Sequence, residues 1–223
     1  MNFFKNVLAS LLGLIIFSFL FFFLLIGIAA AGEGEEMVSV EPSSILYLKL
    51  SGVLQERTTE NPLKDLFPDF AVSEIGLRDL VSAIQHSKED ERIKGIYLDQ
   101  QLLSGGFASL KEVRDALIDF KASGKIIYAY GEYLSEGDYY LASAADVFFM
   151  HPEGSLEFNG LMANITFFKG LFEKLEVKPE IFRVGAFKSA VEPFLRKDMS
   201  PENRLQYTSL LSTIYDIYLT DVA

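Results

Sequence analysis

An unbroken apolar run near the N-terminus constrains this chain more than any other feature. Residues 6–32 contain no charged side chain, and the run exceeds the roughly 20 apolar residues that cross the core of a bilayer. Lys5 precedes the run and Glu33 follows it. The positive-inside bias therefore predicts a transmembrane anchor over residues 6–32, with residues 1–5 as a cytoplasmic stub and the rest of the chain outside.

A cleaved signal peptide is the alternative interpretation of the same run. The small residues 29–32 (AAAG) offer a site for a signal peptidase. The apolar region of a signal peptide is usually only about 7–15 residues long, however, which is much shorter than this run. The length therefore favours a retained anchor.

The remainder is expected to form an acidic linker over residues 33–44 and one domain over residues 45–223. The whole chain has a formal net charge of −11 and lacks a basic stripe, which argues against a nucleic-acid partner. It has no cysteine, and its two histidines, His86 and His151, lie far apart in the sequence. Disulfides, thiolate chemistry and a zinc site are therefore not expected, and no cofactor is predicted.

Strand-like and helix-like segments alternate along the domain. Helical spacing of apolar residues occurs around residues 77–84, 113–120 and 168–175, and a small-residue helix is expected over 137–146. Short β-branched or aromatic runs predict strands at residues 45–54, 93–103, 125–130, 147–150 and 179–185, and residues 55–73 are expected to form a loop. This alternation predicts an α/β fold with a mostly parallel sheet. A helical bundle, the alternative, does not explain the separated strand-like runs.

Two helix starts and one C-terminal stripe can be predicted from local patterns. Ser109 and Glu112 have the spacing of a capping box. Ser200 followed by Pro201 predicts the start of a last helix. We expect its apolar residues to form a core stripe; they are Tyr207, Leu210, Leu211 and Ile214. Because the chain stops at Ala223 without a helix-stop signal, we expect it to be part of a longer protein.

A single lysine stands out among apolar residues near the C-terminal third. Lys188 lies in VGAFKSAVEPF (184–194), with Phe187, Val191 and Phe194 nearby. A lysine acts as a general base only when it is neutral, and burial in apolar surroundings can lower its pKa from about 10.4 by up to about 3–5 units. Lys188 is therefore a candidate for a dry amine that takes a proton from a serine hydroxyl. On spacing alone, a solvated lysine is the more common explanation.

Two longer segments carry a family resemblance. The segments 182–204 (FRVGAFKSAVEPFLRKDMSPENR) and 137–161 (GDYYLASAADVFFMHPEGSLEFNGL) resemble the bacterial signal peptide peptidases of the long, two-repeat SppA type, in peptidase family S49. The resemblance covers roughly residues 45–223. It implies a ClpP/crotonase-like repeat and a membrane-anchored protease with a Ser–Lys dyad, in which Lys188 is the catalytic lysine.

The resemblance also implies that the dyad is split between two repeats. In the long type the N-terminal repeat carries the lysine and the C-terminal repeat carries the nucleophilic serine. Residues 45–223 resemble the N-terminal repeat only, so the C-terminal repeat is apparently missing. The implied substrates are remnant signal peptides, the implied assembly is a homo-oligomer, and the implied location is the bacterial inner membrane with the domain on the periplasmic side.

Other polar and glycine residues are expected to have structural roles. The resemblance places Ser135 where short, single-repeat relatives carry their nucleophile, but Glu136 follows it and would repel a developing oxyanion. We therefore interpret Ser135 as a degenerate copy of that nucleophile, and a helix N-cap is the structural alternative. Gly105 and Gly106 are expected to form a plain turn or a vestigial oxyanion loop, and Asp99 to form a turn. The aromatic pair Tyr139 and Tyr140 is expected to be core or interface.

Two further hypotheses remain open from the sequence. One is a catalytically inactive, membrane-tethered module of ClpP/crotonase type that binds or scaffolds. The other is a self-contained peptidase that uses Ser135 and Lys188 together.

Overall fold

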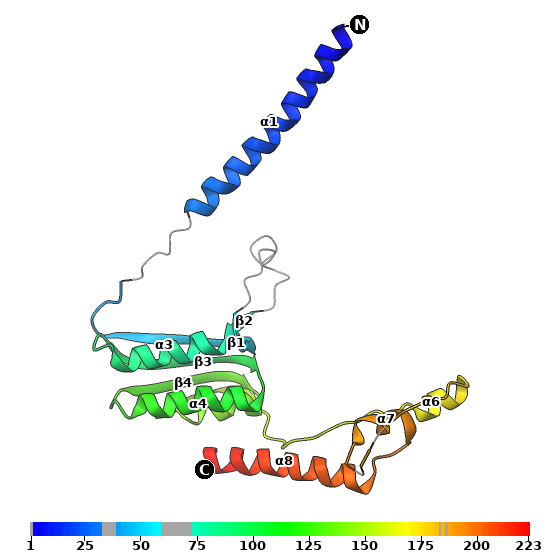
Figure 1. Ribbon diagram of the computed structural model, residues 1–223. Coiled ribbons are helices and arrows are strands. Elements are labelled where there is room, and N and C mark those ends of the chain that lie inside the picture. Colours follow the sequence, from blue (N-terminus) through cyan, green and yellow to red (C-terminus); the bar gives the residue numbers. More distant parts are fainter. Residues whose placement is uncertain (1, 33–38, 59–72, 183, 186) are drawn as a thin grey trace. The chain divides into compact units, whose positions relative to one another are not determined.

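The computed structural model describes residues 2–32, 39–58, 73–182, 184–185 and 187–223 (Figure 1). The chain divides into two compact units, residues 1–40 and residues 41–223, which we describe separately. Most of the predicted linker, residues 33–38, and most of the predicted loop, residues 59–72, lie outside the described residues.

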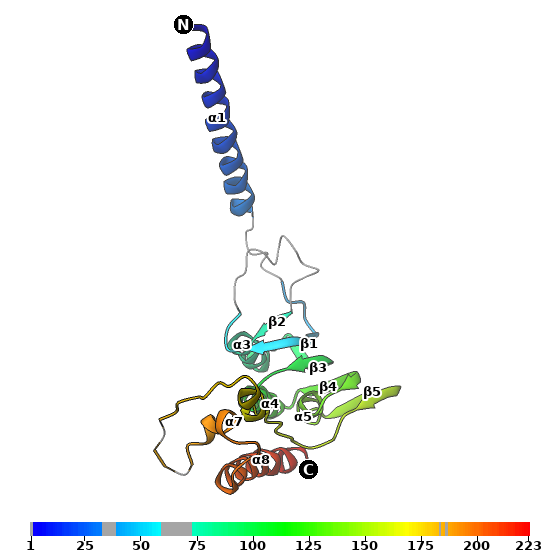
Figure 2. The ribbon, with the colours of Figure 1, turned by 90° about the vertical axis from the view of Figure 1, so that its right-hand side faces the viewer.

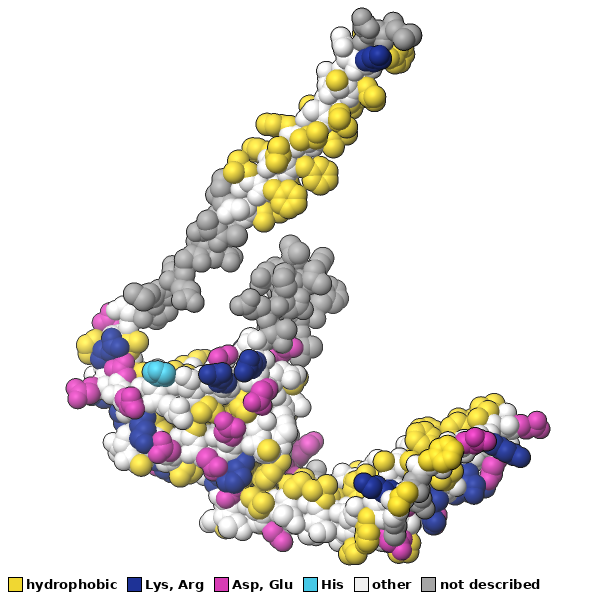
Figure 3. Space-filling model, viewed as in Figure 1, with side chains coloured by type: hydrophobic (Ala, Val, Ile, Leu, Met, Phe, Trp, Pro, Cys, Tyr) yellow, Lys and Arg dark blue, Asp and Glu magenta, His cyan; other side chains and the backbone are white. Residues whose placement is uncertain are grey.

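The first unit contains one helix, α1 (Asn2–Gly32), in agreement with the apolar run in the sequence. Its segment Phe3–Gly27 has a mean hydropathy of 2.8 and is long and apolar enough to cross a membrane. Figure 3 shows hydrophobic side chains along the visible face of this helix. Such a surface is costly in water, so α1 has the composition of a membrane span or of a signal sequence.

The second unit is built on a five-stranded parallel sheet with the order β2-β1-β3-β4-β5. The strands are β1 (Ser44–Gln55), β2 (Glu74–Gly76), β3 (Ile93–Ser104), β4 (Ile126–Leu134) and β5 (Val147–Leu156). The predicted α/β fold with a parallel sheet is therefore confirmed, and each of the first four predicted strands overlaps one of these elements.

Three helices cover one face of this sheet (Figure 2). They are α3 (Leu77–Glu89), α4 (Phe107–Lys121) and α5 (Glu136–Ala142). Among the described residues, no helix covers the opposite face, where the rings of Tyr47 and Tyr97 stack at 5.7 Å. The chain then continues through α6 (Lys169–Lys174), the 3-10 turn η2 (Ser189–Val191), α7 (Glu192–Leu195) and α8 (Pro201–Val222).

The core lies between the sheet and these three helices. Alternate residues of the central strands point toward the helices, among them Ile96, Leu98, Ile127 and Ala129, all fully buried. The helices contribute Ile84, Leu117 and Phe120, which are buried as completely. Apolar side chains recur every second residue along the strands and about every 3.6 residues along the helices, and the two sets pack together in one apolar layer.

Two expected helix boundaries need correction. The predicted capping box at Ser109 and Glu112 is wrong, because α4 begins at Phe107 with Gly106 as its N-cap and without a side-chain cap. The helix starts earlier than expected, and its first residue is already packed. The ring of Phe107 contacts that of Tyr140, with ring centroids 5.2 Å apart. Helix α5 ends at Ala142, four residues before the expected end.

The strand prediction for residues 147–150 was too short, because β5 continues through Pro152 to Leu156. Its pairing with β4 shifts register between Gly131 and Tyr133, so Pro152 lies in an irregular part of an edge strand. Proline is tolerated at bulges and edges because it has no N–H to donate to the ladder.

The strand predicted over residues 179–185 is wrong. The described residues of this segment form no strand, and Phe182 is 96% exposed and Val184 89% exposed. An apolar run becomes a strand only when a neighbouring strand accepts its backbone hydrogen bonds, and no described residue of this segment pairs with the sheet.

The predicted core stripe of the last helix is also wrong. Leu210 is 54% exposed, and Tyr207, Leu211 and Ile214 are only partly covered. The buried residues of α8 are Asn203 and Tyr218. Contact with α5 near the C-terminal end decides which side of α8 is covered, and helical spacing alone could not reveal it.

We expect L117A to lower the free energy of unfolding by about 2–5 kcal/mol, because it leaves a cavity under the sheet. The matched change at the next position, I118A, should cost about 0.5 kcal/mol or less, because Ile118 is 47% exposed. Urea unfolding followed by the near-ultraviolet circular dichroism of the tyrosines measures both. Equal losses for the two variants would contradict the described packing.

Candidate functional site

Lys188 lies at the start of the turn η2, where it is the residue that precedes Ser189. Its backbone N–H donates to the carbonyl of Gly185 over 3.4 Å. Gly185 has a φ of 96°, a conformation that residues with a Cβ rarely adopt. The local turn that presents Lys188 thus depends on a glycine directly before Ala186-Phe187.

The side chain of Lys188 is exposed in this chain. The sequence suggested that neighbouring aromatic rings would keep it dry, and for the isolated chain that expectation is wrong. Phe187 is itself 54% exposed, and Phe194 packs instead on Phe168 and Phe172 with centroids 6.2 Å and 6.3 Å away. The aromatic side chains cluster with one another and leave the amine at the surface.

Lys188 nevertheless opens onto apolar surroundings. A cavity of about 510 Å³ is lined by Phe182, Val184, Phe187, Lys188, Ser189, Ala190 and Val191. Apart from Lys188 and Ser189, the lining residues carry apolar side chains. A second surface placed over this cavity would remove water from the amine, which is the condition for lowering the pKa of a lysine.

A buried carboxylate holds the segment that follows Lys188. Glu192 is 1% exposed. It accepts hydrogen bonds from the Ser200 N–H at 3.0 Å, the Ser200 hydroxyl at 2.5 Å and the Asn203 side-chain amide at 3.0 Å. Ser200 is also the N-cap of α8, as predicted from the sequence, and accepts from the Asn203 N–H. Glu192 therefore joins α7 to the first turn of α8.

The hydrogen bonds at Glu192 decide its ionisation. Burial is the largest single influence and acts to raise the pKa of this carboxyl, but the hydrogen bonds from Ser200 and Asn203, together with the positive charge of Arg196, leave the pKa below its ordinary value. Glu192 is thus an anion stabilised by neutral donors and by a nearby cation. The sequence analysis did not predict that Glu192 joins α7 to α8. A single acid among apolar residues, shortly before the helix N-cap Ser200, was a signal that could have indicated it.

Ser135 is a helix N-cap, the structural alternative that the sequence offered. Its hydroxyl donates to a carboxylate oxygen of Asp138 at 2.6 Å, and the same hydroxyl accepts from the Asp138 N–H at 3.2 Å. The Ser135 N–H in turn donates to the Asp138 carboxylate at 3.0 Å, which completes a capping box. The Ser135 hydroxyl is therefore engaged in capping α5.

Gly105 and Gly106 form the turn between β3 and α4. A Cβ on Gly105 would lie 3.1 Å from the Cβ of Leu54, so close packing explains the first glycine. Gly106 has an extended conformation as the N-cap of α4. Asp99, in contrast, is not a turn former: it lies inside β3 and accepts from the Tyr47 hydroxyl and, at 2.8 Å, from the Gln101 amide.

Glu136 has a structural partner that the sequence did not reveal. Its carboxylate accepts the backbone N–H of Gly160, which fastens the segment after β5 to the start of α5. The neighbouring aromatic residues lie in the core or against it, as predicted. Tyr140 is fully buried, and Tyr139 packs edge-on against Phe158 at 5.9 Å.

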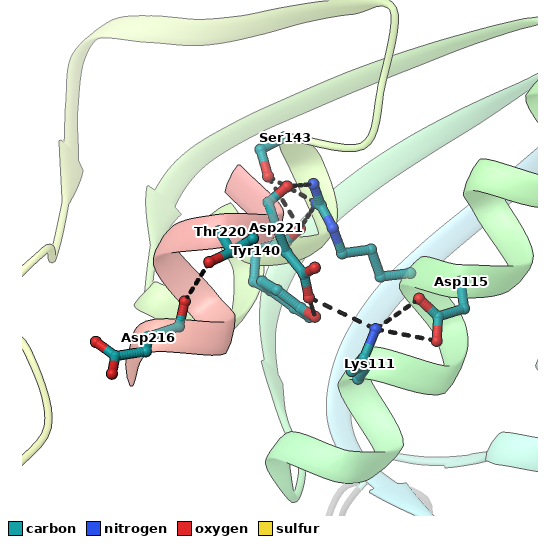
Figure 4. Close-up of polar contacts among 8 residues, drawn as sticks. Lys111, Asp115, Tyr140, Ser143, Asp216, Thr220 and Asp221 are labelled. Carbon is teal, nitrogen blue, oxygen red and sulfur yellow. Dashed lines mark hydrogen bonds and ion pairs between the residues drawn. The ribbon is translucent and has the colours of Figure 1, made fainter. Parts of the chain in front are cut away.

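A polar network attaches the end of α8 to α4 and α5 (Figure 4). Arg114, which is buried, donates to the backbone carbonyls of Tyr140 and Asp221 and to the Ser143 hydroxyl at 2.8 Å. The Tyr140 hydroxyl donates to the Asp221 carboxylate. Burial and this hydrogen bond raise the pKa of Tyr140, so the phenol remains a neutral donor.

We expect E192Q to lower the free energy of unfolding at neutral pH by about 1–3 kcal/mol, since Ser200 loses a charged acceptor. The pKa of Glu192 is lower in the folded chain, so its contribution is complete above the unfolded value of about 4.3 and is lost as pH falls through the folded value. E192Q should lack this acid-induced loss. Urea unfolding between neutral pH and about pH 3 measures the difference.

The control for this prediction is E180Q, which changes an exposed acid in the preceding segment. Its unfolding should follow the parent chain at every pH. An E192Q chain that loses stability on acidification as steeply as the parent would contradict the role of Glu192.

Comparison with known proteins places this chain in a family. Residues 119–223, which include Ser135 and Lys188, match the sequence model of peptidase family S49. Protease 4 of Haemophilus influenzae is 35% identical over 202 residues, covering 88% of this chain and 33% of that protein. Protease 4 of Salmonella typhi is 35% identical over 216 residues, covering 92% and 35%. The chloroplastic serine protease SPPA of Arabidopsis thaliana is 32% identical over 184 residues, covering 82% and 26%.

The chain thus spans about a third of the length of the Protease 4 relatives it matches. Among solved structures, an enoyl-CoA hydratase/isomerase family protein from Silicibacter pomeroyi covers 78% of this chain with 14% identity and a TM-score of 0.33. The assignment of the fold class accordingly rests on the parallel sheet itself. The assignment of the chain to a family rests on the sequence matches. The chain belongs to peptidase family S49 and is of the SppA type.

Proposed function

We propose that this chain supplies the general base of a membrane-anchored serine endopeptidase with a Ser–Lys dyad. The observation that carries the proposal is the placement of Lys188. It is an exposed residue on a glycine turn beside an apolar cavity, and the segment that follows it is held by the hydrogen bonds of the buried Glu192. Ser135 is used as a helix cap. The nucleophilic serine would therefore come from a second repeat, which suits a chain that spans about a third of its relatives.

The chemistry needs a neutral lysine. In the assembled enzyme a covering surface would exclude water from the cavity at Lys188 and lower the pKa of the amine. The neutral amine then takes the proton of the serine hydroxyl as the oxygen attacks a peptide carbonyl. The resulting ammonium gives that proton to the departing amine, and water hydrolyses the acyl-enzyme with Lys188 again acting as the base.

The substrates we infer are remnant signal peptides, which are apolar and lie near a membrane. The apolar helix α1 would hold the protein in the inner membrane by a single span, with residues 41–223 on the periplasmic side. A homo-oligomer is also part of the proposal, and exposed apolar residues of α8 such as Leu205 and Leu210 are available for contacts between copies.

We expect K188A, in a protein that joins this chain to a second repeat, to reduce peptide cleavage by about 100-fold or more, because the attacking serine loses its base. The control K178A removes another exposed lysine of the same segment and should leave cleavage unchanged. Hydrolysis of a fluorogenic apolar peptide measures both. A serine-reactive fluorophosphonate probe that labels Ser135 in the chain of residues 1–223 would falsify the split dyad.

We expect the chain to stay with membranes during extraction with alkaline carbonate, because α1 buries its apolar surface in the bilayer. Protease added to intact spheroplasts should digest residues 41–223. Release of the chain by carbonate, as for a peripheral protein, or protection from external protease would contradict the proposed anchor and orientation.

A catalytically inactive scaffold is the second candidate, and the exposure of Lys188 in this chain favours it. The K188A experiment separates the two candidates. Full activity of K188A in the joined protein would remove the lysine from the mechanism and leave binding or scaffolding as the role of this unit.

A further inference from the structure

A second cavity lies far from Lys188 in the sequence, at the carboxyl ends of β3 and β4. It has a volume of about 360 Å³ and is lined by Leu103, Ser104, Gly105, Phe107, Leu110, Ser135, Glu136, Gly137, Tyr140, Leu161, Ile214 and Tyr218. Ligand pockets usually have volumes of about 300–1,000 Å³. In open parallel sheets, ligands bind in crevices at this end of the strands. Size and place therefore both indicate a binding site.

Specific contacts build the walls of this cavity. The Glu136–Gly160 hydrogen bond fixes the segment that leads into Leu161. Tyr218 of α8 stacks on Tyr140 with centroids 5.4 Å apart, and its hydroxyl donates to the Glu136 carbonyl at 3.2 Å. The Arg114 network holds the same end of α8. The cavity is thus enclosed by three segments that are tied to one another.

The lining defines the chemistry of the occupant. Among the residues that the structure describes, the lining holds no lysine or arginine and a single acid, Glu136, which accepts the Gly160 N–H. The Ser135 hydroxyl is likewise committed to Asp138. An anionic ligand would lose hydration without gaining a cationic partner from these residues. Leu103, Phe107, Leu110 and Ile214 instead present apolar surface.

We propose that this cavity is a non-catalytic subsite that binds an apolar side chain of an extended peptide. The inference rests on the proposed function, because a peptidase unit meets apolar peptides. It assigns to this repeat a role in holding substrate that is separate from the proton transfer at Lys188. Ser135, one of the lining residues, takes part as a helix cap and a wall of the cavity and not as a nucleophile.

The test is peptide binding by the full chain in lipid nanodiscs. The probe is the fluorescein-labelled pentapeptide Ala-Ala-Leu-Ala-Ala, with Ala-Ala-Asp-Ala-Ala as its polar counterpart, and fluorescence anisotropy measures affinity. The leucine peptide should bind roughly tenfold or more tightly than the aspartate peptide. Equal affinities would overturn the proposal.

The variant I214W should fill the cavity and weaken binding of the leucine peptide by roughly tenfold or more. Its control is L210W, one turn earlier on α8, where the side chain is exposed and lies outside the cavity lining; it should bind as the parent does. I214A, which enlarges the cavity, should shift preference from leucine to phenylalanine at the central position. Unchanged binding by I214W and an unshifted preference of I214A would each overturn the proposal.

Two further outcomes distinguish the occupant and the mechanism. If the parent chain self-associates in sedimentation experiments and I214W abolishes this, a second copy occupies the cavity and the peptide subsite is wrong. K188A should bind the leucine peptide like the parent. If K188A still binds the leucine peptide, and K188A in the joined protein still cleaves peptides at the parent rate, the proposed subsite stands. The proposed catalytic role of Lys188 is then overturned.

Discussion

The fully buried carboxylate of Asp138 fixes the ends of two strands and the start of a helix beside the cavity that Ser135 lines. It accepts the Ser135 N–H at 3.0 Å, the Ser135 hydroxyl at 2.6 Å and the Leu103 N–H at 2.9 Å. A buried anion is stable only when such donors replace water. The same group therefore sets the end of β3, the end of β4 and the start of α5. Ser135 is held in a capping role as a direct result.

The sequence predicts the layered architecture well because the relevant signals are local. Alternation along 93–103 and helical spacing over 113–120 each reflect burial on one side of one element. The N-cap at Ser200 and the cap at Ser135 are local in the same way. These features could be predicted because each depends on residues within one or two turns.

The environment of the candidate residues depends on distant contacts and could not be predicted. The Gly160 N–H that binds Glu136 comes from 24 positions away. The covered side of α8 depends on Asp221 meeting Arg114 across 107 positions. Phe194 was expected near the amine of Lys188 but packs with Phe168. The assignment of Lys188 as a base stays a prediction.

The hydrogen bond between Glu136 and Gly160 has a consequence for substitutions beside Ser135. The Glu136 carboxylate reaches the Gly160 N–H from 24 positions away and so holds the segment that leads into Leu161. Replacing Glu136 by glycine would therefore do more than change the residue beside Ser135, because it would also release that segment from the start of α5. A substitution at this position acts on two segments of the chain at once, and its effect on one cannot be separated from its effect on the other.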